Sequence, residues 1–131
     1  MTKDELFENF SYLSTWEEKY SYLIDLGNQL PPFKEEDKTD QNKVEGCMSQ
    51  VWFTHKKKEG KNYFNATSDA LIVKGLEAVL IYLINEKTDE EILNLDLVQI
   101  FEELGLKDHL SPTRRNGFFA MIERIFNLIK K

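Results

Sequence analysis

Cys47, the one cysteine in the chain, is the residue whose chemistry most constrains a function. A cysteine thiolate attacks sulfur, whereas a buried thiol behaves as a small and inert apolar group. Gly46 stands directly before Cys47, and an apolar run begins at Val51. Glycine frees the backbone for loop conformations, and loops commonly present reactive groups. The stretch 44–53 therefore predicts a cysteine at a loop tip between two β segments, with a buried structural cysteine as the alternative.

The histidines add no recognisable metal site. Zinc is held by about four ligands at close spacing, and Cys47, His55 and His109 do not supply such a set. A hydrolase with Cys47 as nucleophile and His109 as base is an enzymatic alternative, but nothing specific in the sequence supports it. The glycines are scattered singly, so the sequence contains no glycine-rich phosphate loop. We therefore expect neither a bound metal nor a bound cofactor.

The composition is that of an ordinary soluble globular protein. A chain of 131 residues, 41% hydrophobic and 31% charged, can bury a hydrophobic core without disulfides or a structural metal. We expect one domain over 1–131. Its formal net charge of −6 argues against nucleic acid as the main partner, because phosphate binding needs a basic surface. The apolar run 78–84 is too short to span a bilayer, and the N-terminus lacks a signal-peptide core. We expect a cytoplasmic protein.

Capping signals predict helices on both sides of the cysteine stretch. Capping boxes with apolar residues at helical spacing predict helices that begin at Thr2, Thr15 and Thr88, the second of them ending near Gly27. The longest apolar segment predicts a central, mostly buried helix from Asp69 to about Glu86, with Ser68 as its cap. Two further helices are expected, over Asp96–Leu104 and from the Ser111-Pro112 start to about Ile129.

The β segments are expected around the cysteine. Strand-like residues predict strands over 43–45, 50–57 and 63–67, with a turn over 59–62. The polar segment 33–42 is predicted to be an ordered surface loop. Lysines 56–58 are typical of a solvated hairpin end that discourages edge pairing, which is a simpler interpretation than contact with nucleic acid.

Charged residues stand at the start of two predicted helices. Asp69 falls in the first turn of the central helix, where a carboxylate favours the positive end of the helix dipole. Arg114 and Arg115 fall in the first turn of the last helix, where a cation opposes the dipole. Solvent exposure would make that cost small; alternatively, an arginine there pairs with Asp69 or lies near Cys47. Both interpretations stay open at the level of sequence.

Short motifs in a fixed order resemble the SufE-like sulfur-acceptor proteins of iron–sulfur cluster assembly, and the resemblance covers nearly the whole chain. The N-terminal helical part is similar in Trp16-Glu17-Glu18-Lys19-Tyr20, Leu26-Gly27 and Leu30-Pro31. The cysteine motif is similar in Gln41-Asn42, Val44, Gly46-Cys47, Ser49 and Val51-Trp52. The start of the central helix is similar in Ser68-Asp69-Ala70 and Ile72-Val73-Lys74-Gly75. The last motif is similar in Leu110-Ser111-Pro112-Thr113-Arg114 and Asn116-Gly117.

The resemblance implies an α+β fold, in which a small three-stranded antiparallel sheet packs against helices as in SufE and IscU. It implies that Cys47 accepts persulfide sulfur from a PLP-dependent cysteine desulfurase of the SufS or CsdA kind. The carrier would stimulate that enzyme, not act as an enzyme itself, and pass the sulfur to a SufBCD-type scaffold. It also implies that residues support the loop or bind the partner, namely Gly46, Ser49, Asp69 and Arg114. A module that regulates a desulfurase without carrying sulfur, with Cys47 merely packed, is the alternative.

Overall fold

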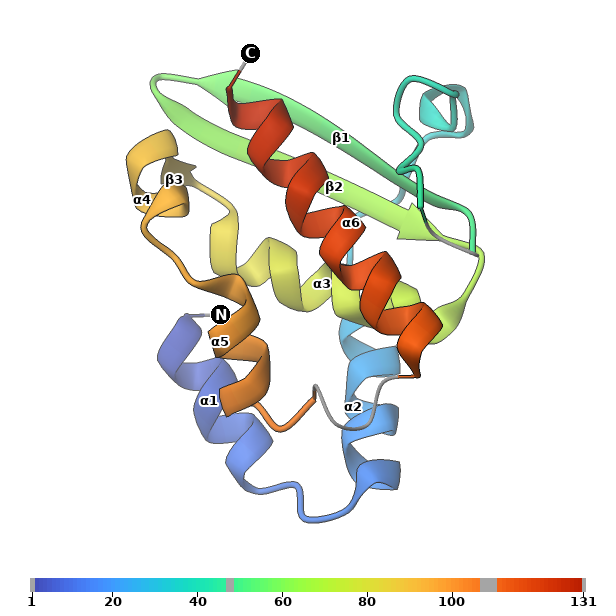
Figure 1. Cartoon of the computed structure of the whole chain (residues 1–131), viewed down its shortest axis with the longest axis vertical. Coiled ribbons are helices and arrows are strands. Elements are labelled where there is room, and N and C mark those ends of the chain that lie inside the picture. Colours follow the sequence, from blue (N-terminus) through green and yellow to red (C-terminus); the bar gives the residue numbers. More distant parts are fainter. Residues whose placement is uncertain (1, 47–48, 107–110, 131) are drawn as a thin grey trace.

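The structure is a computed structural model that describes residues 2–46, 49–106 and 111–130. An antiparallel sheet of three strands, in the order β1-β2-β3, packs against helices (Figure 1). The strands are β1 (Val51–Lys58), β2 (Lys61–Ser68) and β3 (Lys87–Thr88). The helices are α1 (Lys3–Ser11), α2 (Trp16–Asn28), the 3-10 turn η1 (Glu35–Asp37), α3 (Leu71–Ile84), α4 (Asp89–Leu93), α5 (Leu97–Glu103) and α6 (Pro112–Ile129). The predicted α+β class is confirmed.

The sheet is built on the β1–β2 hairpin. Its register runs from Val51 opposite Ser68 to Lys58 opposite Lys61. The turn residues Glu59 and Gly60 have φ angles of 52° and 79°, as in the tight two-residue turns that match the twist of paired strands. The turn is shorter than the predicted 59–62, because residues 61 and 62 already pair within β2.

The third strand is not the one predicted from the sequence. The predicted strand 43–45 makes an isolated bridge between Lys43 and Trp52, whereas the third strand of the sheet is β3, which pairs with residues 61 and 62 of β2. The segment 42–44 runs beside the start of β1, but its described ladder is too short to count as a strand. The predicted number of strands is right, and the assignment of the third is wrong.

Helix α3 occupies the centre of the molecule and crosses α2 at a pair of glycines. A Cβ atom added at Gly27 would lie 2.9 Å from the backbone nitrogen of Gly75, and one at Gly75 would collide with the carbonyl of Leu23. Only residues without a side chain allow the two helix backbones to approach so closely. Helix α2 ends at Asn28 with Gln29 as its C-cap, so its end falls near Gly27 as predicted, although Gly27 itself serves the helix crossing and is not the cap.

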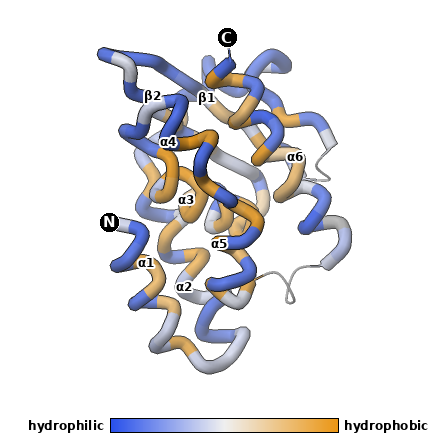
Figure 2. The backbone as a smooth tube through the Cα atoms, turned by 60° about the vertical axis from the view of Figure 1, so that its left-hand side comes forward, coloured by the Kyte–Doolittle hydropathy of each residue, from blue (hydrophilic) through white to orange (hydrophobic). Residues whose placement is uncertain are grey.

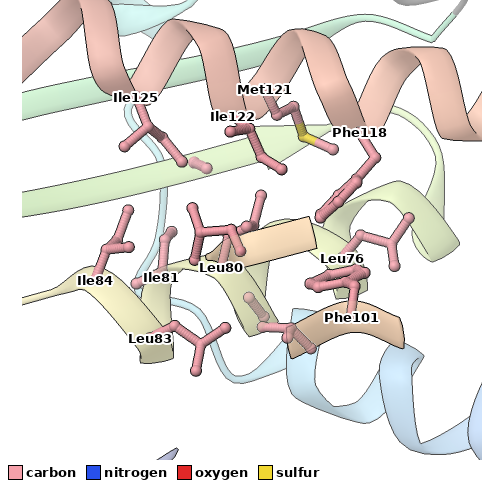
Figure 3. Packing of buried hydrophobic residues seen from close by; sticks show 14 of the residues in the cluster. Leu76, Leu80, Ile81, Leu83, Ile84, Phe101, Phe118, Met121, Ile122 and Ile125 are labelled. Carbon is pink, nitrogen blue, oxygen red and sulfur yellow. The ribbon is translucent and has the colours of Figure 1, made fainter. Parts of the chain in front are cut away.

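Helix α6 closes the core from the other side. Figure 3 shows Phe118, Met121, Ile122 and Ile125 of α6 pointing toward Leu76, Leu80 and Ile81 of α3. The ring of Phe118 also stacks on that of Phe101 in α5, with centroids 3.9 Å apart. Hydrophobic residues gather where α3, α5 and α6 meet (Figure 2). In the described ranges, every helix is too short or too polar to cross a membrane.

Candidate functional site

The segment 45–50, which contains Cys47, connects two paired stretches of chain. At its base, the backbone N–H of Val44 donates to the carbonyl of Val51 at 2.8 Å, and both side chains are buried. One step farther from the loop, the N–H of Phe53 donates to the carbonyl of Asn42 at 2.9 Å. Cys47, Met48 and His109 lie outside the described residues, so the exposure of the thiol stays a matter of prediction. The described residues fix the frame from which it is presented.

Gly46 enters the loop with a φ of +90° and lies against α6. A side chain at this φ would be strained, because only glycine adopts the left-handed region without cost. A Cβ atom added at Gly46 would lie 3.5 Å from the Cβ of Ala120. The glycine thus gives the chain the turn that leads into Cys47 and seats that turn on the last helix.

Asp69 holds the other side of the loop. Its carboxylate oxygen Oδ1 accepts a hydrogen bond from the backbone N–H of Gln50 at 3.0 Å, and its own N–H donates to the Gln50 carbonyl at 3.3 Å. The pair continues the β1–β2 register by one step beyond Val51 and Ser68. A bond from a backbone N–H to a carboxylate is of the charge-assisted and stronger kind. Asp69 therefore fixes where the loop rejoins the sheet.

This role differs from the helix-start position that the sequence predicted for Asp69. Helix α3 begins at Leu71 with Ala70 as its N-cap, so Asp69 lies before the first turn. Ser68 is still paired in β2, and its hydroxyl accepts from the N–H of Ala70 at 3.2 Å, which bends the chain from strand to helix. The predicted Ser68 cap and the predicted start at Asp69 are both wrong, because the strand extends farther than its sequence indicated.

Two predicted site residues remain, Ser49 and Arg114. Ser49 is half-buried beside Gln50. Arg114 is exposed in the first turn of α6, behind the predicted Ser111 cap, whose hydroxyl accepts from the Arg114 N–H at 3.3 Å. Within the ranges described, Arg114 makes no ion pair with Asp69. Along the helix axis it lies roughly 9 Å from Ala120. The structure therefore favours solvent exposure over the Arg114–Asp69 pair.

Sequence reasoning missed a second contact between α6 and the chain that approaches the loop. The guanidinium of Arg124 donates to the backbone carbonyl of Gln41, and its Nε atom is buried without a hydrogen-bond partner among the described residues. Ala120 and Arg124 are four residues apart, so they share one face of the helix. That face supports the chain at both Gln41 and Gly46. The four-residue spacing indicates that Ala120 and Arg124 share a helix face, but no sequence pattern shows which segment that face contacts.

The described residues do not group into a metal centre, since no three His, Cys, Asp or Glu side chains lie together as potential ligands among them. The site is instead a backbone frame around one loop. Backbone pairing holds the loop's base, Asp69 holds its exit, and α6 lies against its entry. Such a frame positions a group on the loop and leaves the chemistry to that group.

Comparison with known proteins places this frame in a family. One solved structure with the same fold is the solution structure of a hypothetical protein from Thermus thermophilus, with a TM-score of 0.79 and 18% sequence identity. The match covers 99% of this chain and 96% of that one. The family model SufE, described as an Fe-S metabolism associated domain, matches residues 4–129. The chain therefore belongs to the SufE family, which is associated with iron–sulfur metabolism.

Proposed function

We propose that this protein is a cytoplasmic sulfur carrier that accepts persulfide sulfur on Cys47 from a PLP-dependent cysteine desulfurase. Membership of the SufE family supports a role in iron–sulfur metabolism. Cys47 is the one cysteine in the chain, so a covalent sulfur acceptor of this kind has a single candidate. One thiol suits a carrier of a single sulfur atom better than a scaffold, which holds a cluster through several ligands.

The observation that carries this proposal is the frame around residues 45–50. The backbone pair of Val44 and Val51 holds the base, and the Asp69 carboxylate holds Gln50 at the exit. Both ends of the loop are therefore fixed at one end of the hairpin. A reactive group is most useful when a rigid scaffold positions the loop that bears it.

The transfer is an exchange between sulfur atoms. The Cys47 thiolate attacks the outer sulfur of a persulfide on the desulfurase cysteine, since the thiolate is the reactive form. A new bond forms between Cys47 Sγ and that outer sulfur, and the sulfur–sulfur bond of the enzyme persulfide breaks. The enzyme cysteine leaves as a thiolate, so no external oxidant or reductant is needed. Removal of the persulfide frees the desulfurase for another turnover, which accounts for stimulation.

The partners we propose are a desulfurase of the SufS or CsdA kind and, for onward transfer, a SufBCD-type scaffold complex. The protein itself contributes no PLP and no metal in this scheme. Gly46 is exposed and Ser49 half-buried within the loop segment, and Arg114 is exposed in the first turn of α6. Because Asp69 is already engaged with Gln50, we assign it to loop support and Arg114 to partner contact.

Intact-protein mass spectrometry tests the proposal. The protein is incubated with a cysteine desulfurase and cysteine, and its mass should rise by one sulfur atom in a form that dithiothreitol removes. Cys47→Ser should fold normally, gain no sulfur and fail to stimulate the enzyme. If the wild-type chain stimulates the desulfurase without gaining sulfur, and Cys47→Ser does so equally well, the protein is a non-covalent regulator and the carrier function is wrong.

A further inference from the structure

A groove runs along one face of α2, beside the link between α1 and α2. It has a volume of about 450 Å³, and its lining consists of Leu13, Glu17, Glu18, Ser21, Tyr22 and Asp25. Residues 18, 21, 22 and 25 follow the three- and four-residue spacing of a single helix face, so the groove follows the helix axis. In Figure 1, the α1–α2 link lies at the opposite end of the molecule from strands β1 and β2.

The floor of the groove is apolar and preformed. Leu13 and Tyr22 are half-buried and pack against the hydrophobic core. The ring of Tyr22 packs edge-on against Phe10, with centroids 5.2 Å apart, and its hydroxyl accepts from the Asn9 amide at 2.9 Å. Because these contacts fix the ring, an apolar side chain can pack on it without reordering the floor. The groove therefore suits a ligand that carries an apolar group.

The rim of the groove is acidic. Glu17, Glu18 and Asp25 are exposed there, and no lysine or arginine is among the described residues of the lining. Hydrogen bonds from the side chains of Ser14 and Thr15 hold the pKa of Glu18 below its ordinary value of 4.5, so this carboxylate is charged at neutral pH. In the part of the chain that the structure describes, none of the three rim carboxylates forms an ion pair.

The charge around the groove has the same sign. Residues 1–30 hold six acidic and two basic side chains, and so carry four of the six net negative charges of the chain. The two basic side chains lie elsewhere. The ammonium of Lys3 is 5.7 Å from the ring centre of Phe7, and that of Lys19 lies over Gly105, where an added Cβ atom would be 2.6 Å away. The groove therefore favours a positively charged ligand.

Helix stability explains only part of this acidity. Glu17 and Glu18 lie in the first turn of α2, where carboxylates favour the helix dipole, and Glu18 completes a capping box with Thr15. Asp25 lies in the last turn of the same helix, where a carboxylate opposes the dipole. A positively charged ligand would give Asp25 the partner that its own helix does not supply.

The carboxylates are spread along the groove and do not converge on one point. Within the described ranges, no three His, Cys, Asp or Glu side chains lie together so that they could hold a metal ion. Separate positive charges on one chain, flanking an apolar group, match this arrangement better than a point charge does. A second copy of this chain is a poor source of them, because its basic segment 56–61 has no apolar side chain and Lys57 is already bonded to Asp89.

We propose that this groove binds a basic amphipathic segment of a partner protein. Apolar side chains of the segment would pack on Leu13 and Tyr22, and its lysine or arginine side chains would pair with the acidic rim. Placing the apolar face of a helix in a groove is a recurring mode of peptide recognition, and charges across the rim select the partner. The site does not depend on the proposed function of Cys47.

Fluorescence anisotropy tests the site on the full chain, kept reduced, with a labelled helical peptide of Lys, Leu and Ala whose leucines share one face. Binding should weaken as salt rises. Glu17→Lys and Asp25→Lys should each weaken it by about fivefold or more. Glu90→Lys is the matched control and should leave binding unchanged. Glu90 is exposed at the second position of α4, as Glu17 is in α2, and each precedes the glutamate of a capping box.

Two further comparisons separate binding from folding and from charge alone. A cation in the last turn of a helix favours the dipole, so Asp25→Lys should weaken binding without lowering the melting temperature. A peptide with Glu in place of Lys should not bind. A peptide with Ser in place of Leu should bind more weakly than the parent peptide, because the apolar floor is then left without a partner.

Backbone amide NMR of the wild-type chain locates the contact, and the amides of Leu13 and α2 should shift when the Lys–Leu peptide is added. The proposal is overturned if that peptide does not bind at millimolar concentration, if the Glu or the Ser peptide binds equally well, or if the shifted amides lie only in other elements. It is also overturned if Glu90→Lys weakens binding as much as Glu17→Lys. If sedimentation shows self-association that Asp25→Lys removes, the occupant is a second copy and a partner protein is the wrong assignment.

Discussion

The two ends of the β1–β2 hairpin are held in different ways. At the turn end, the buried side chain of Asn62 donates to the carbonyl of Lys87 and to the carboxylate of Asp89, and it pairs with the ring of His55. Lys57 donates to the same carboxylate at 2.7 Å. At the loop end, one carboxylate, that of Asp69, holds one backbone N–H, that of Gln50. The turn end is a side-chain network, and the loop end is a backbone clamp.

The difference separates stability from positioning. A fully buried amide with several partners contributes strongly, because its loss leaves those partners without their hydrogen bonds. A single clamp at the end of a loop contributes less to stability but fixes where the loop rejoins the sheet. We therefore expect substitutions at the turn end to change the free energy of unfolding and substitutions at the loop end to change sulfur transfer. The predictions below test this division, from the largest expected effect on stability to the smallest.

The largest effect is expected for Asn62→Ala. The substitution removes both amide donors and the acceptor for His55, so three half-buried partners lose their hydrogen bonds to a fully buried side chain. We expect a loss of about 2–3 kcal/mol in the free energy of unfolding. Urea denaturation measures it, and sulfur acceptance measured in native buffer should be unchanged.

Asn65→Ala is the matched control for that prediction. Asn65 lies in the same strand, and the hydrogen bonds from its amide nitrogen to the carbonyls of Pro31 and Pro32 are long, at 3.4 Å. Its loss should cost clearly less than that of Asn62. Equal losses in the free energy of unfolding would show that the turn-end network stabilises the protein no more than the weak hydrogen bonds of Asn65 do.

Substitution of Glu77 should change the stability without altering either end of the hairpin. Glu77 lies fully buried in the middle of α3, and its carboxylate oxygens have no hydrogen-bond partner among the described residues. Burial raises the pKa of Glu77 well above its ordinary value of 4.5, and the charge of Lys74 opposes this only in part. Glu77→Met should therefore stabilise the protein at neutral pH by about 1–3 kcal/mol, without changing sulfur transfer.

The pH dependence of Glu77 has a definite sign. Between pH 4.5 and the raised pKa, the folded protein keeps a proton that the unfolded chain releases, so stability falls as pH rises through this window. The melting temperature of wild-type protein should drop relative to Glu77→Met as pH rises from about 5 to 8. A constant difference between the two proteins across that range would contradict a buried, neutral Glu77.

Asp69 tests the loop end. Asp69→Ala removes the acceptor for the Gln50 N–H and should cost about 1 kcal/mol of stability while slowing sulfur acceptance severalfold, because the loop exit is no longer fixed. Asp69→Asn keeps an oxygen acceptor and should restore most of the rate. Glu90→Gln on α4 is the control for loss of one acidic charge. If Asp69→Asn is as slow as Asp69→Ala, the charge and not the hydrogen bond is what matters.

Local signals predicted most of the fold but not the frame around the loop. Capping residues such as Thr15 and Ser111 make their bonds within a few residues of chain, so the helix starts could be predicted from spacing. The start of α3 could not, because the pairing of Ser68 with Val51 across the hairpin extends the strand beyond its local pattern. The same pairing converts Asp69 from a helix-start residue into a clamp. The hydrogen-bond partner of Asp69 is Gln50, which follows from the register of the hairpin. The sequence did not predict that register because it predicted too long a turn.

The site was predicted as a set of residues and not as an arrangement. Gly46 could be predicted to turn the chain, because a residue's own backbone freedom is a local property. Its contact with Ala120 and the contact of Arg124 with Gln41 join segments far apart in sequence. Two-residue β3 was missed for the same reason, since its pairing with residues 61 and 62 of β2 is a tertiary contact. Tertiary contacts of this kind leave no periodic pattern in a single sequence.

The smallest effect on stability is expected for Lys57→Met, which removes one arm of the turn-end network. The hydrogen bond from Lys57 is the main reason that the pKa of Asp89 lies below its ordinary value of 3.8, with that from Asn62 second. A lowered carboxyl pKa contributes stability above the unfolded value, and that contribution is lost as pH falls through the folded value. The ion pair is exposed to solvent, so the substitution should lower the melting temperature only slightly at neutral pH, and the difference should vanish in acid. Thermal melts at several pH values measure this, with Lys58→Met on the exposed outer face as control. A loss as large as that of Asn62→Ala would mean that the surface charges, and not the buried amide, hold the turn end together.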